Sequence, residues 1–164
     1  MTDMTDEERT VEFFEQWGVS HDAMSAAFRE VFSSDCLWEQ RPMAVTTGPD
    51  EAVRFLRRAK LFMGLETVDV DIRNITSVGG IVHTERVDHL RRADGRLIVS
   101  APVAGILEWR GGRIVTWREY FDSATFVGRA LPRVCVGAAQ RASALLRRVA
   151  QASPRWPAPR GFPS

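Results

Sequence analysis

The sequence predicts an α+β domain in which N-terminal helices pack against a curved antiparallel sheet. In the first third of the chain, apolar residues recur at helical spacing, whereas from residue 68 onward they alternate with a period of two. The chain has 164 residues, of which 45% are hydrophobic and 26% are charged. This length and composition suit one ordinary folded domain.

Three helices are expected in the N-terminal part. The first two span residues 7–17 and 21–32, with Ser20 between them as an N-cap. The third begins near residue 47, where Pro49 and the acidic pair Asp50 and Glu51 form a typical helix start, and it runs to about Met63.

Four strands follow, at residues 68–75, 80–91, 96–109 and 113–121. The turns between them contain glycine, which predicts hairpins and therefore an antiparallel meander. A further amphipathic helix is expected from about residue 134 to residue 149.

The predicted organisation is an α+β domain at 7–131, a basic amphipathic helix at 132–152 and a proline-rich, disordered tail at 153–164. Residues 123–164 carry seven Arg and neither Asp nor Glu, so the rest of the chain is acidic. We expect the C-terminal helix to pack on its own domain or on a partner subunit, in preference to a membrane surface. Nucleic acid is a poor partner for a chain with an acidic body and almost no Lys.

Several function classes are disfavoured. No apolar run is long enough to span a membrane, the N-terminal region is acidic where a secretory leader would be basic, and the cysteines lack metal-site spacing. His83 and His89 would lie ~20 Å apart along one strand, and nucleotide-binding motifs are absent. We therefore expect a cytoplasmic protein without metal or cofactor.

Arg86 and Asp88 share one face of the strand at 80–91 because side chains alternate along a strand. Taken alone, this spacing is most simply a solvated charge pair of ~0–1 kcal/mol. It gains weight from the segments around it, Thr-Glu-Arg-Val-Asp at 84–88, Trp-Arg-Glu-Tyr-Phe-Asp at 117–122 and Trp-Glu-Gln-Arg-Pro at 38–42.

Together these segments resemble the limonene-1,2-epoxide hydrolase family, over about residues 11–131. The resemblance implies a cone-shaped, nuclear-transport-factor-like (SnoaL-like) fold, a homodimer and a cofactor-independent hydrolase. The family's Asp-Arg-Asp triad would fall on Asp88, Arg86 and Asp122. Asp122 would be the general base on water, Asp88 the general acid to the epoxide oxygen, and Arg86 the cation between them.

The sequence departs from the family pattern where a tyrosine and an asparagine hold the attacking water, since Trp38 and Gln40 stand there. Gln40 can both donate and accept a hydrogen bond, whereas an indole only donates. Three alternatives stay open: a bulkier substrate, an epoxide-opening cyclase that uses a substrate hydroxyl, and a non-catalytic module that binds a lipophile.

The residues expected to line the pocket are mostly apolar, and they favour a lipophilic epoxide as substrate. They are Met63, Leu65, Val68, Leu90, Ala101, Val103 and Phe126.

Overall fold

A computed structural model of the chain describes residues 4–122. The elements, in order, are α1 (Asp6–Glu15), the 3-10 helix η1 (Gln16–Gly18), α2 (His21–Val31), β1 (Phe32–Arg41), β2 (Ala44–Thr47), α3 (Gly48–Met63), β3 (Thr67–Val78), β4 (Ile81–Arg91), β5 (Leu97–Arg110) and β6 (Arg113–Phe121). The predicted C-terminal helix, the tail and Phe126 lie outside the described residues.

Local chemistry at the helix ends sets where the helices begin and end. Thr5 and Glu8 form a reciprocal capping box on α1, and the Ser20 hydroxyl accepts the backbone N–H of Ala23 at the start of α2, as predicted. Helix α3 starts with Pro49 in its first turn and ends at Gly64, whose φ of 75° is the left-handed conformation that closes helices.

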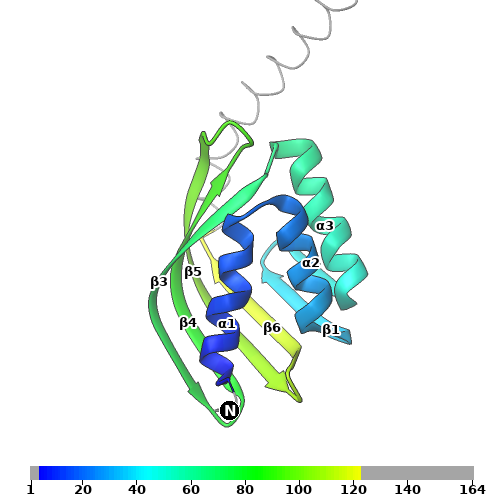
Figure 1. The fold of residues 1–164 in the computed structure, drawn as a ribbon, viewed down its shortest axis with the longest axis vertical. Helices are drawn as coiled ribbons and strands as arrows, with labels where there is room; N and C mark the ends of the chain where they lie inside the picture. Colours follow the sequence, from blue (N-terminus) through cyan, green and yellow to red (C-terminus); the bar gives the residue numbers. More distant parts are fainter. Residues whose placement is uncertain (1–3, 123–164) are drawn as a thin grey trace, which may run out of the picture.

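One mixed sheet forms the second layer, in the strand order β2-β1-β6-β5-β4-β3. The meander β3 to β6 is antiparallel, whereas β1 runs parallel to β6. The sheet curves around the helices, which all lie against its inner side (Figure 1). No helix within residues 4–122 is long and apolar enough to cross a membrane.

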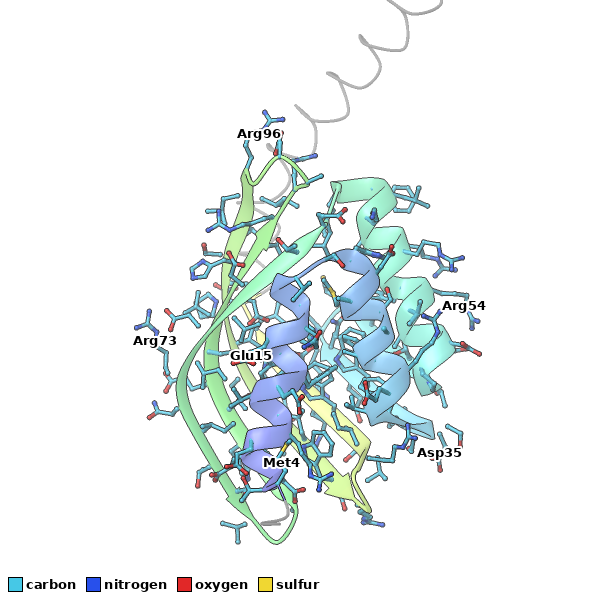
Figure 2. All side chains as sticks on the ribbon, viewed as in Figure 1. Met4, Glu15, Asp35, Arg54, Arg73 and Arg96 are labelled. Atoms are coloured by element: carbon cyan, nitrogen blue, oxygen red, sulfur yellow. The ribbon has the colours of Figure 1, made fainter. Side chains whose placement is uncertain are left out.

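Aromatic residues fill much of the space between the two layers. Phe13 and Phe14 of α1, Phe28 of α2 and the tryptophans of β1 and β6 are all at most 3% exposed. Charged side chains such as Arg54 of α3 and Arg73 of β3 point outward instead (Figure 2). Burying so many rings is the main stabilising contribution available to this domain.

The predicted fold class is confirmed: helices come first and pack on a curved sheet. Within residues 4–122, each predicted helix and strand is present, with ends that differ by at most a few residues. Strands β1 and β2 were not predicted. Their side chains do not alternate cleanly, because β1 contains a register shift between Phe32 and Leu37.

Candidate active site

The site is built on the inner face of β4. Burial alternates along this strand, and Arg86 and Asp88 both point toward the helices. The guanidinium of Arg86 donates two hydrogen bonds to the carboxylate of Asp88, from Nε to Oδ1 at 2.9 Å and from Nη2 to Oδ2 at 3.2 Å. Arg86 is 1% exposed and Asp88 is 8% exposed. The pair is therefore buried, and the expectation for a solvated ion pair does not apply.

A second carboxylate, that of Glu119, reaches the same guanidinium from β6. Nη2 of Arg86 donates a hydrogen bond to Oε1 of Glu119. The other oxygen, Oε2, accepts the indole N–H of Trp38 at 2.8 Å and the amide N–H of Gln40 at 3.4 Å. Asp88, Arg86 and Glu119 thus form a carboxylate–guanidinium–carboxylate cluster.

Aromatic rings cover the cation. The guanidinium carbon of Arg86 lies 4.7 Å from the ring centre of Phe14 and 5.7 Å from that of Trp117. These rings supply cation–π attraction, and they keep water away from the charges. Low local polarity strengthens every electrostatic interaction in the cluster.

Two carboxylates compete for one guanidinium, which shapes the titration of the cluster. Burial raises the pKa of Glu119 above its ordinary 4.5, and the nearby Asp88 raises it further, against the lowering effects of Arg86 and Trp38. Burial opposes the charge of Arg86, but Asp88 and Glu119 outweigh it and raise the Arg86 pKa above its ordinary value. The guanidinium therefore stays charged, and Glu119 is a stronger base than an exposed glutamate.

A largely apolar cavity of about 520 Å³ opens above the cluster. Asp88, Glu119, Trp38 and Gln40 all contribute to its lining. The cavity is also lined by the apolar residues that were predicted to line it and that lie within the described chain, namely Met63, Leu65, Val68, Leu90, Ala101 and Val103. Helices α2 and α3 add apolar walls that were not predicted, including Met24, Phe28, Phe55, Leu56 and Phe62. Its size is typical of pockets for small lipophilic molecules.

Asp122 is not part of this cluster, contrary to the interpretation of the sequence. It follows the last residue of β6, its side chain is exposed, and it does not line the cavity. The reason is the period of the strand: Trp117 and Glu119 point inward, so a residue three positions beyond Glu119 does not share their face. Strand periodicity applied to residues 117–122 would have identified Glu119.

Trp38 lines the same cavity as Gln40. Its only polar hydrogen is bonded to Glu119, so it orients this carboxylate and cannot at the same time hold a water molecule. Gln40 keeps a free acceptor, because its buried Oε1 has no hydrogen-bond partner within residues 4–122. No group of three His, Cys, Asp or Glu in the same range could hold a metal ion.

Comparison with known proteins identifies the family of the chain. Residues 5–133 match the family described as the limonene-1,2-epoxide hydrolase catalytic domain. The chain belongs to this family. A curated relative, epoxide hydrolase EphG of Mycobacterium tuberculosis, is 36% identical over 88 residues, which are 54% of this chain and 56% of that protein. The match thus spans about half the length of the relative.

Solved structures extend the family assignment to the fold. A limonene-epoxide-hydrolase-like epoxide hydrolase from M. tuberculosis superposes with a TM-score of 0.63 and 22% identity, covering 82% of this chain and 96% of that one. A SnoaL-like polyketide cyclase, described as putative, from Shewanella putrefaciens superposes with a TM-score of 0.64 and 17% identity, covering 78% and 86%. At these identities the likeness establishes the shared fold, which hosts more than one chemistry.

Proposed function

We propose that this member of the limonene-1,2-epoxide hydrolase family adds water to a lipophilic epoxide and releases a vicinal diol. The observation that carries the proposal is the position of Arg86, which joins two buried carboxylates where they meet an apolar cavity. Ring opening needs one carboxylate to take a proton and another to give one. The cluster supplies both groups without a cofactor.

In the proposed reaction Glu119 is the general base. Its carboxylate removes a proton from water as the water oxygen forms a bond to an epoxide carbon. The C–O bond to that carbon breaks, and Asp88 donates its proton to the departing oxygen. Both hydroxyls of the diol are then complete, Glu119 holds one proton, and Asp88 must regain one before the next turnover.

The charges of the cluster support this assignment of roles. With both carboxylates ionised, the cluster would carry a net negative charge in an apolar setting; one added proton makes it neutral. Donors from Trp38, Gln40 and Arg86 all point at Glu119, so its carboxylate is held in one orientation, as a general base requires. The elevated pKa of Glu119 also suits a base that works near neutral pH.

Gln40 is the side chain best placed to hold the nucleophile. Its Nε2 faces Glu119, while its Oε1 lacks a partner among residues 4–122 and can accept the remaining proton of the attacking water. Trp38 acts on the base, which it keeps in orientation. The same arrangement accepts a substrate hydroxyl in place of water, and the product would then be a cyclic ether.

The test is oxygen-18 incorporation from labelled water during a single turnover of limonene-1,2-epoxide and other lipophilic epoxides. We expect label in the diol from the native chain and no turnover by Glu119→Gln or Asp88→Asn. Asp122→Asn is the matched control, since it makes the same chemical change outside the cluster. Its activity should stay within about twofold of the native value, because Asp122 is exposed and does not line the cavity.

Three outcomes would contradict the proposal. An inactive Asp122→Asn together with an active Glu119→Gln would restore the assignment made from the sequence. An unlabelled cyclic product would identify an epoxide-opening cyclase. A native chain that binds epoxides without turning any over would identify a lipophile-binding module.

A further inference from the structure

The two halves of the cluster come from strands that are not neighbours. Asp88 and Arg86 lie on β4 and Glu119 lies on β6, with β5 between them. At ~4.8 Å between adjacent strands, the backbones of β4 and β6 are ~10 Å apart. The guanidinium must therefore pass over the inner face of β5 to reach Glu119.

The residue of β5 at this crossing is Gly105. It pairs with Thr84 of β4 on one side and with Glu119 of β6 on the other. The inner-facing neighbours along β5, Val103 and Leu107, carry branched side chains, whereas Gly105 presents no side chain. The side chain of Arg86 crosses β5 at this position, where no side chain of β5 stands in its way.

Neighbouring side chains already occupy the space that a side chain at position 105 would need. A Cβ atom built on Gly105 would lie 2.8 Å from Nη1 of Arg86, 2.7 Å from Oγ1 of Thr84 and 3.4 Å from Nε1 of Trp117. Real Cβ atoms almost never approach other heavy atoms within 3.0 Å. Both the Thr84 hydroxyl and the flexible end of Arg86 would therefore have to move.

Thr84 fixes the guanidinium in the same place. Its Oγ1 accepts Nη1 of Arg86 at 3.2 Å and donates to the carbonyl oxygen of Gly105 at 3.4 Å. Each nitrogen of the guanidinium is thus bonded, through Asp88, Glu119 or Thr84. A displaced guanidinium cannot keep all of these bonds.

We infer that Gly105 is a positioning residue of the active site, whose missing side chain lets Arg86 cross β5 and couple Asp88 to Glu119. Glycine is needed at 105 because a side chain would not fit there. The backbone conformation does not require it, since Gly105 does not have a positive φ. The inference rests on the proposed function for its effect on turnover, but the position of the guanidinium can be measured without substrate.

The test is the Gly105→Ala variant, with Ala104→Val as the matched control. Ala104 is the preceding residue of β5 and is exposed on the outer face, so the control enlarges the same strand away from Arg86. The substrate-free readout is the titration of the Glu119 carboxyl carbon, followed by ¹³C NMR. Loss of the nearby cation should raise the Glu119 pKa in Gly105→Ala and leave it unchanged in the control.

With limonene-1,2-epoxide, kcat of Gly105→Ala should fall by roughly 100-fold while KM changes little, because a displacement of ~1 Å in the catalytic geometry has that effect. If Gly105→Ala does not fold, Thr84→Ala/Gly105→Ala is compared with Thr84→Ala. The double variant removes the closest clash and keeps the one with Arg86.

An unchanged Glu119 titration in a folded Gly105→Ala variant overturns the inference, even if the variant is less stable. A raised pKa together with lost turnover supports it. A raised pKa in a protein whose native form turns over no epoxide supports the positioning role and refutes the proposed function, so the two can fail separately.

Discussion

Glu119 is a buried carboxylate whose protonation is coupled to the stability of the fold. The residue is 4% exposed, and its carboxylate accepts hydrogen bonds from Trp38, Gln40 and Arg86. Burial nevertheless dominates and raises its pKa. A group that holds its proton more tightly in the folded state than in the unfolded state makes folding less favourable once it must ionise.

This predicts a pH-dependent gain in stability for Glu119→Gln. Because the folded pKa lies above the ordinary value of 4.5, the contribution of Glu119 to stability is fully present below pH 4.5 and is lost as pH rises through the folded pKa. Glutamine resembles the protonated form and escapes this loss. The free energy of unfolding of the variant should therefore exceed that of the native chain by a margin that grows with pH.

Urea denaturation of both chains at several pH values between about 4 and 8 measures this margin. Glu108→Gln provides an opposite control, because hydrogen bonds from Arg110 and Thr116 lower the pKa of Glu108. Glu108→Gln should therefore be less stable than the native chain, with a deficit that is fully present above pH 4.5 and disappears as pH falls through the lowered pKa of Glu108. If Glu119→Gln lost stability in the same way, the raised pKa of Glu119 would be wrong.

At the scale of elements, the site depends on how α3 is attached to the sheet. The helix supplies cavity residues such as Phe55, Leu56 and Met63, and it begins directly after β2. Gly48, its first residue, has a φ of 71°, and a Cβ there would overlap the carbonyl oxygen of Ser34 in β1. This close approach fixes the start of α3 against β1.

Gly48→Ala is therefore expected to destabilise the fold by more than Gly79→Ala. Both glycines have positive φ, but a Cβ on Gly79 would meet no atom within 4 Å. Gly79→Ala should cost about 1 kcal/mol from backbone strain alone, and Gly48→Ala should cost this amount plus the steric overlap. Equal losses in the free energy of unfolding would show that the contact with Ser34 does not hold the helix.

Elements with regular periods could be predicted from the sequence, and elements whose partners are distant could not. Ser20 and Pro49 identified helix starts because capping is local, and the glycine turns identified the meander. The parallel pairing of β1 with β6 joins Trp38 to Trp117 across most of the domain, and no local pattern encodes it. This pairing is also what brings Trp38 and Gln40 to Glu119.

The site was predicted in part for the same reason. Arg86 and Asp88 are two residues apart on one strand, so alternation alone places them together. The second carboxylate bound by Arg86 is that of Glu119 on β6, whereas the family resemblance had predicted Asp122. Within the segment at 117–122, Glu119 is buried and faces the cluster, whereas Asp122 is exposed.

At the scale of the whole molecule, the domain encloses a lipophilic space between its two layers. The sheet contributes the charged cluster together with Ala101 and Val103, and α2 and α3 contribute the opposite wall. A ligand that enters must contact both layers. Such a ligand binds only the folded state, so it should stabilise the protein in proportion to RT ln(1 + [L]/Kd).

Ala59→Phe tests whether this cavity is the binding site. Ala59 lies on α3, is half-buried and lines the cavity, so a phenyl ring there takes up part of the space from the helix side, whereas Asp88, Arg86 and Glu119 lie on the sheet. KM for limonene-1,2-epoxide should rise by roughly tenfold or more, in line with a loss of ~1.4 kcal/mol or more of binding energy. The rise in melting temperature produced by the corresponding diol should shrink in parallel.

Arg57→Phe is the matched control, because Arg57 lies two residues away on the same helix, is exposed and does not line the cavity. It adds the same ring on the solvent side and should leave both readouts unchanged. If Ala59→Phe bound the diol as tightly as the native chain, the ligand would have to occupy another surface. Asp88 and Glu119 would then form a buried ion cluster whose role is structural, because a reacting epoxide must contact these carboxylates from inside the cavity.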